Sequence, residues 1–200
     1  MKSESSKNIS LIIIIVAFVA TLYGTYEAIK IVSKTQIGTN DGIYTNRVTS
    51  SQEISKKARE LAQNCNNDAC RVQKILDYVT HIPYKINHFQ AHSPQRTIQN
   101  NFGDCDDKSN LLISMLHVLN IESYFVLVPE HIFVISHIDD EKLASKKGIW
   151  LNGKKYFVLE STAESSKIGF PLRNKLEDID AVIDPFSNIK IPIDHIAYKL

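Results

Sequence analysis

The sequence lacks an excess of charge of either sign. Its 200 residues carry 23 lysines and arginines against 22 aspartates and glutamates, which gives a formal net charge of +1. Nucleic-acid-binding domains carry a basic excess, so we expect no nucleic-acid partner. Internal repeats and low-complexity tracts are also missing, and an apolar fraction of 44% with 22% charged residues is typical of a globular fold. Function must therefore come from specific residues.

The sequence also lacks the patterns that hold a metal ion. Only three cysteines are present, none of them in a C-x-x-C pair, and the seven histidines follow no ligand spacing. A zinc quartet is therefore missing. The acidic run at residues 104–107 lacks the alternating ligands and the glycine of a calcium loop. We expect no metal and no cofactor.

The N-terminus carries a long apolar run. Residues 9–29 read ISLIIIIVAFVATLYGTYEAI, and no charge lies between Lys7 and Glu27. About 20 apolar residues suffice to cross a bilayer, so we expect a transmembrane anchor over residues 9–29 after a polar start at residues 1–8. A cleaved signal peptide is the main alternative, although no good small-x-small site follows the run. Lysines on both sides leave the orientation open.

Two cysteines lie close together in the segment NCNNDAC at residues 64–70. We expect a short-loop disulfide between Cys65 and Cys70 at a turn between helices; the alternative is a pair of reduced cysteines. A disulfide requires an oxidising compartment. With the anchor, it predicts a single-pass membrane protein whose domain is periplasmic or exterior.

The first part of the chain after the apolar run is predicted to be helical. Residues 30–50 are polar, contain two glycines and show no sustained period, so we expect a linker followed by one domain over residues 51–200. Apolar spacing predicts two helices between residues 51 and 82, the second ending before Pro83. A wide apolar face over residues 107–119 predicts a buried central helix.

Later segments favour strands. The runs YFVLV at residues 124–128 and IFVIS at residues 132–136 are rich in β-branched and aromatic residues, and Asn152-Gly153 between two apolar runs predicts a hairpin. Residues 182–194 read VIDPFSNIKIPID, and their prolines restrict them to edge strands. Helices first and antiparallel strands afterwards indicate an α+β fold.

The segment GDCDD at residues 103–107 combines one thiol with three carboxylates. Nearby carboxylates raise the pKa of a thiol. At the start of a helix, however, unpaired N–H groups and the helix dipole favour a thiolate. Asp104 is suited to cap the helix, and Asp106 and Asp107 to occupy its first turn, so their side chains need not point at Cys105. Cys105 is therefore a candidate nucleophile.

A thiol nucleophile needs a base and a group that orients the base. His131 opens a predicted strand, and Glu160 ends a later one. If the sheet packs on the central helix, both side chains project over the start of that helix. The pattern predicts a triad in which Cys105 attacks a carbonyl, His131 holds the proton and Glu160 fixes the ring. The Cys105 backbone N–H is a candidate oxyanion donor.

The segments GDCDDKSNLLISMLHVLNI, EHIFV and YFVLEST resemble the core of the transglutaminase-like superfamily, in particular its bacterial and archaeal cysteine-peptidase-like members. The resemblance covers residues 72–165 and implies a papain-like α+β fold. It also puts Cys105, His131 and Glu160 in the triad positions, with glutamate where the family usually has aspartate. The family's second oxyanion donor has no unique match here: Gln90, His92 and Gln99 are all candidates.

The resemblance implies a membrane-anchored cysteine hydrolase or acyltransferase that acts on amide bonds of a peptide or protein through a thioester at Cys105. Peptidase or deamidase activity is favoured over crosslinking by the resemblance alone, because the three residues fit all these reactions. The alternative is a non-catalytic binding or scaffold module with the same fold in the cell envelope. The reactivity of Cys105, and its dependence on His131, separates the two.

Overall fold

A computed structural model describes the backbone of residues 2–39, 42–87 and 91–200. The chain forms two compact units, Met1–Gln36 and Ile37–Leu200. The first is a helix, α1 (Lys2–Thr35). Its stretch Asn8–Ile29 has a mean hydropathy of 2.2, and none of its residues is buried. This length and composition fit a membrane span, and an N-terminal signal sequence meets the same criterion.

The second unit begins inside the predicted linker. Strands β1 (Gln36–Thr39) and β2 (Gly42–Thr45) form a two-stranded sheet. Ile37 and Tyr44 are buried in the main hydrophobic core. The linker expected over residues 30–50 therefore differs from the structure, in which the folded unit starts at residue 37 rather than 51. Strands of four residues are too short to leave a recognisable period.

Four helices follow, and side chains cap each of them. They are α2 (Gln52–Ala62), α3 (Asp68–His81), α4 (Pro94–Asn100) and α5 (Cys105–Val118), capped by Ser51, Asn67, Ser93 and Asp104. The predicted disulfide between Cys65 and Cys70 closes the connection from α2 to α3. Helix α5 is the central one, since α2, α3, α4 and two strands all pack against it.

The six remaining strands make one antiparallel sheet in the order β7-β3-β4-β6-β5-β8. They are β3 (Ser123–Val128), β4 (His131–Ser136), β5 (Gly148–Leu151), β6 (Lys154–Leu159), β7 (Ala181–Ile183) and β8 (Ile196–Lys199). The hairpin at Asn152-Gly153 is confirmed, with positive φ angles of 48° and 85°. Both edge strands come from the C-terminal part: β7 overlaps the start of the segment 182–194 in which edge strands are expected, and β8 follows that segment. Short 3-10 turns lie at η1 (Glu141–Leu143) and η2 (Leu176–Asp178).

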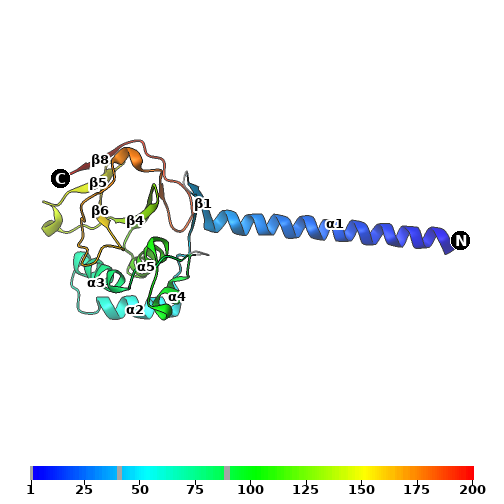
Figure 1. Ribbon diagram of the computed structural model, residues 1–200, viewed down its shortest axis with the longest axis horizontal. Helices are drawn as coiled ribbons and strands as arrows, with labels where there is room; N and C mark the ends of the chain where they lie inside the picture. The colour runs from blue at the N-terminus through cyan, green and yellow to red at the C-terminus, as the bar shows by residue number, and fades with distance from the viewer. Residues whose placement is uncertain (1, 40–41, 88–90) are drawn as a thin grey trace. The chain divides into compact units, whose positions relative to one another are not determined.

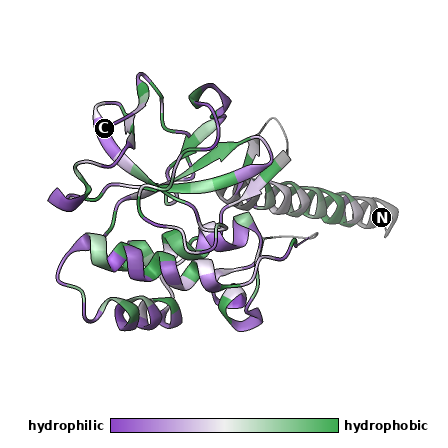
Figure 2. Ribbon diagram, turned by 60° about the vertical axis from the view of Figure 1, so that its left-hand side comes forward, coloured by the Kyte–Doolittle hydropathy of each residue, from purple (hydrophilic) through white to green (hydrophobic). Residues whose placement is uncertain are grey.

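The sheet buries both faces. Alternate residues such as Phe125 and Leu127 pack toward the helices, while Val126 and Val128 belong to a second cluster. The long C-terminal segment covers that second cluster with Phe170, Leu172 and Ile179. Figure 1 shows the helical layer on one side of the sheet, and Figure 2 shows apolar residues running along the strands. The predicted α+β fold is confirmed.

Candidate active site

Cys105 is the first residue of α5, and the segment before it is tightly held. The Gly103 N–H donates to Pro83 O at 3.2 Å, and the Lys85 N–H donates to Gly103 O at 3.1 Å. A Cβ atom at Gly103 would lie 2.7 Å from the Cβ of Asp107, so only glycine fits there. Asp104 caps α5 by accepting from the Asp107 N–H at 3.2 Å. These contacts hold the backbone of residues 103–105 at the start of α5, where the sequence predicts the helix N-terminus.

His131 and Glu160 lie at neighbouring strand ends and are in direct contact. His131 opens β4, and Glu160 follows the last residue of β6, whose Leu159 pairs with Val134. The distance from His131 Nε2 to Glu160 Oε2 is 2.9 Å. Oε1 of Glu160 accepts from the N–H and hydroxyl of Thr162 at 3.0 and 2.7 Å. Burial alone would raise the pKa of Glu160, but these hydrogen bonds and the imidazole leave it lowered.

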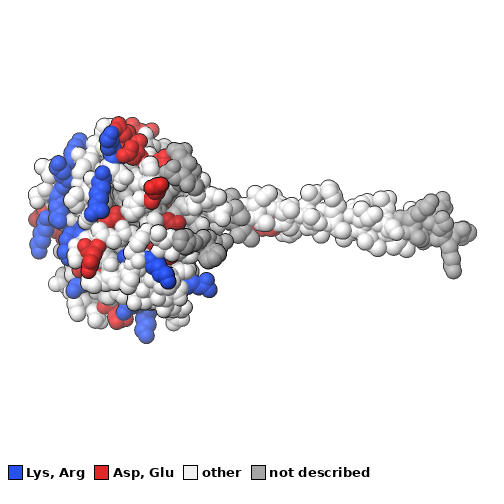
Figure 3. Space-filling model, viewed as in Figure 1, with Lys and Arg blue, Asp and Glu red and all other residues white. Residues whose placement is uncertain are grey.

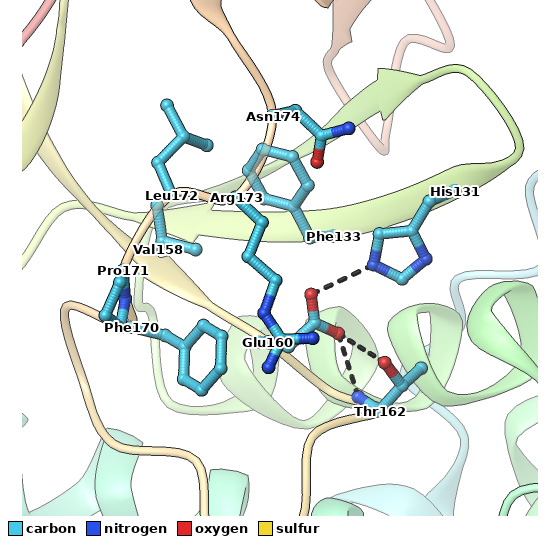
Figure 4. Close-up of a pocket in the computed structure, with 10 residues that line it drawn as sticks. All are labelled: His131, Phe133, Val158, Glu160, Thr162, Phe170, Pro171, Leu172, Arg173 and Asn174. Atoms are coloured by element: carbon cyan, nitrogen blue, oxygen red, sulfur yellow. Dashed lines mark hydrogen bonds and ion pairs between the residues drawn. The ribbon is translucent and has the colours of Figure 1, made fainter.

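The thiol of Cys105 approaches β4 at the residue next to His131. The Ile132 backbone N–H donates toward the sulfur and favours its ionised form. In the described part of the chain, no hydrogen bond links the sulfur to the imidazole. Because Glu160 engages Nε2, the ring nitrogen left for another partner is Nδ1, on the side away from Glu160 (Figure 4).

The electrostatics of Cys105 differ from the expected thiolate. Burial, followed by the charges of Asp106 and Asp104, raises the pKa of Cys105 to about 12. Asp104 and Asp107 turn to other partners, but the Asp106 carboxylate lies 3.8 Å from the sulfur. Burial and its acidic neighbours raise the pKa of Asp106 to about 7. Desolvation and the nearby carboxylates therefore outweigh the backbone N–H groups of Asp106 and Ile132, which favour the ionised thiol.

Three residues are candidates for the second oxyanion donor: Gln90, His92 and Gln99. The His92 ring nitrogen Nδ1 lies 3.1 Å from the fully buried carboxylate of Asp107, two residues after Cys105. Gln99 is exposed on α4. Gln90 lies outside the described residues. Of the two described candidates, His92 is the one that the structure connects to the first turn of α5.

Two buried polar side chains near the site were missed by the sequence reasoning. Lys108 is 1% exposed and donates to Thr80 O and Ile82 O at 3.3 and 2.8 Å, and burial lowers its pKa to about 8. Tyr44 is also buried, and burial and Asp106 raise its pKa. The sequence did contain one signal for Lys108: it is a charged residue within a helix that is predicted to be buried. Within the described residues, no group of three or more metal-binding side chains occurs.

The comparison with protein families agrees with this arrangement of helix and strands. The model of the transglutaminase-like superfamily matches residues 55–159. The chain belongs to the transglutaminase-like superfamily. The matched region contains Cys105 and His131 and ends one residue before Glu160. A comparison with the curated proteins found no match.

Similar solved structures include bacterial protease candidates. A candidate cysteine protease of Cytophaga hutchinsonii is 20% identical with a TM-score of 0.44, over 60% of this chain and 39% of its own. A candidate protease of Parabacteroides distasonis is 17% identical with a TM-score of 0.48, over 74% and 29%. LapG of Legionella pneumophila is 13% identical with a TM-score of 0.40, over 69% and 86%. The chain thus spans less than half the length of the first two.

Proposed function

We propose that the protein is a membrane-anchored cysteine hydrolase or acyltransferase of amide bonds, with peptidase or deamidase activity favoured over crosslinking. The observation that carries this proposal is the 2.9 Å contact between His131 and Glu160 beside the N-terminus of α5. A carboxylate on one imidazole nitrogen fixes the tautomer and leaves the other nitrogen to accept a proton. Family membership supports the cysteine peptidase-like chemistry.

In the proposed reaction, the Cys105 thiol attacks the substrate carbonyl while its proton passes to Nδ1 of His131. The raised pKa of the thiol favours transfer during attack over a standing ion pair. The imidazolium then gives this proton to the departing amine, which leaves a thioester. Water then attacks the thioester as His131 takes its proton; the C–S bond breaks, the carboxylic acid leaves, and His131 returns the proton to the Cys105 thiolate. Glu160 holds the ring throughout. The Cys105 N–H is the proposed oxyanion donor.

The proposed location is the outer side of a membrane. The apolar, unburied span of α1 supports an anchor. The disulfide between Cys65 and Cys70 supports an oxidising compartment. Acidic and basic side chains are interspersed on the domain face drawn in Figure 3, so we expect local groups at the site to select the substrate.

A non-catalytic scaffold is the second candidate, because a thiol with a pKa of about 12 is a poor nucleophile at rest. The deciding experiment treats the full chain in detergent micelles with envelope peptides and searches for an acyl adduct on Cys105 by mass spectrometry. We expect an adduct that is lost in Cys105→Ala and reduced in His131→Ala. His81→Ala removes an exposed histidine and serves as the control. Absence of any adduct, with alkylation of Cys105 unaffected by His131→Ala, would favour the scaffold.

A further inference from the structure

A buried lysine lies about one helical turn after Cys105 and has no part in the reaction described so far. Lys108 is 1% exposed, although burying a charged group costs free energy unless hydrogen bonds compensate for it. An apolar side chain of the same volume would fill this place without that cost. The contacts of the ammonium group show what the lysine adds here.

The ammonium group of Lys108 holds the end of a neighbouring helix. It donates to Thr80 O at 3.3 Å and to Ile82 O at 2.8 Å. Thr80 lies in the last turn of α3, and Ile82 is the C-cap of that helix. The last carbonyls of a helix lack intrahelical partners, and the helix dipole favours a cation beside them. Lys108 therefore ties the C-terminal end of α3 to α5.

The chain that leaves α3 connects the same lysine to the segment before Cys105. The carbonyl of Ile82 accepts from Lys108, three positions after Cys105. The next carbonyl along the chain, that of Pro83, accepts from the N–H of Gly103, two positions before Cys105. These two consecutive carbonyls are therefore bound by residues on either side of Cys105 in the sequence, and they hold its backbone from both sides.

We propose that Lys108 is a positioning residue, which holds the carbonyls of residues 82 and 83 so that the backbone N–H of Cys105 stays directed at the substrate carbonyl. This inference rests on the proposed function, in which that N–H stabilises the oxyanion that forms when the sulfur attacks. Such a donor is effective because its position is fixed before the reaction. Lys108 acts through the backbone that it holds, without touching the substrate.

Two reactions of the same thiol separate positioning from general support of the fold. Acylation of Cys105 by p-nitrophenyl acetate passes through an oxyanion, whereas alkylation by iodoacetamide displaces iodide and forms no oxyanion. The sulfur is the nucleophile in both reactions, so a change in its ionisation affects both rate constants. Their ratio therefore reports the oxyanion donor. Both rate constants are measured on the full chain in detergent micelles by peptide mass mapping of Cys105.

The variants are Lys108→Met, which keeps the length of the side chain and removes its donors, and Lys108→Gln, which keeps a donor on a shorter side chain. Lys146→Met is the matched control, because Lys146 likewise donates to a backbone carbonyl, that of Ile168 at 2.9 Å. We expect Lys108→Met to lower the ratio of acylation to alkylation by about 100-fold, as misplacement of a reacting group does. Lys108→Gln should lower the ratio less, and Lys146→Met should leave it unchanged.

Hydrogen exchange of the Lys85 and Gly103 amides tests the geometry without any reaction. Both amides should be protected in the natural chain, because they donate to Gly103 O and Pro83 O, and Lys108→Met should speed their exchange. Rapid exchange in the natural chain or an unchanged ratio in the folded variants would overturn the positioning role. Loss of folding in both Lys108 variants, followed by near-ultraviolet circular dichroism, would show a structural role instead. Failure of the proposed function appears separately, as the absence of an acyl adduct from envelope peptides on Cys105 of the natural chain.

Discussion

At the residue scale, the Asp106 carboxylate lies beside the Cys105 thiol. One carboxylate oxygen lies 3.8 Å from the sulfur, and the charge of Asp106 is the largest raising influence on the thiol pKa after burial. We expect Asp106→Asn to lower that pKa and to speed alkylation of Cys105 at pH 8 by about tenfold, since one pKa unit changes the thiolate fraction tenfold. Timed iodoacetamide labelling with peptide mass mapping measures this. An unchanged rate would mean that burial and Asp104, without Asp106, keep the thiol protonated.

The same substitution should change how stability depends on pH. The folded pKa of Asp106 is raised to about 7 from 3.8, so the folded state binds an extra proton between these values. Stability therefore falls as pH rises from about 4 to 7. Asp106→Asn should flatten this fall, measured by thermal unfolding at pH 5 and pH 8. A variant with the same pH profile as the natural chain would contradict the raised pKa.

Glu160 is proposed to orient the imidazole. Glu160→Gln keeps the size of the side chain but removes the charge that stabilises the imidazolium. The neutral imidazole is also no longer held by a carboxylate, so its wrong tautomer becomes populated. We expect formation of the acyl adduct to slow by roughly 10²- to 10⁴-fold, with little change in the fold. Single-turnover mass spectrometry follows the adduct. Glu160→Asp, which restores the usual residue of the family, should retain more activity than Glu160→Gln; the reverse order would contradict an orienting role.

At the scale of elements, the cap of α5 couples stability to the site. Asp104 accepts from the Asp107 N–H and, with its other oxygen, from the Asn87 N–H at 3.0 Å. Asp104→Ala should lower the free energy of unfolding by about 1 kcal/mol, and Asp104→Asn should lower it less because asparagine caps equally well. Chemical denaturation measures both. Equal losses in the two variants would show that charge, rather than capping, is what Asp104 contributes.

Some of these elements could be predicted from the sequence, and others could not. Long periodic segments such as α5 and the Asn152-Gly153 hairpin were predictable, because periodicity and turn chemistry are local. The contact between His131 and Glu160 followed from their strand ends. The β1–β2 pair was missed, since its burial depends on packing of Tyr44 against Phe125 at a ring distance of 5.0 Å. The direction of the Asp106 side chain depends on tertiary packing, so local sequence patterns do not predict it.

At the scale of the whole molecule, the disulfide stabilises the folded unit. Cys65 and Cys70 are five positions apart, between α2 and α3. Closing so short a loop reduces the entropy of the unfolded chain and contributes about 2 kcal/mol. We expect the double substitution to serine to lower the free energy of unfolding by about that amount, measured by denaturation. If dithiothreitol also lowers the free energy of unfolding of the double variant, its effect does not come from reducing the Cys65–Cys70 disulfide.

Retention or cleavage of α1 decides whether the proposed membrane anchor exists. The span Asn8–Ile29 is apolar and unburied, so its release into water would expose a large hydrophobic surface. We propose an uncleaved anchor and expect the intact mass of the mature protein to include α1 and the chain to resist carbonate extraction. Glu27 lies near the end of the span and not at its centre. A charge at the bilayer centre carries a large cost in free energy. Val16→Lys should therefore release the domain from the membrane fraction, whereas Val16→Leu should retain it. A mature N-terminus after residue 29 would identify α1 as a cleaved signal sequence instead.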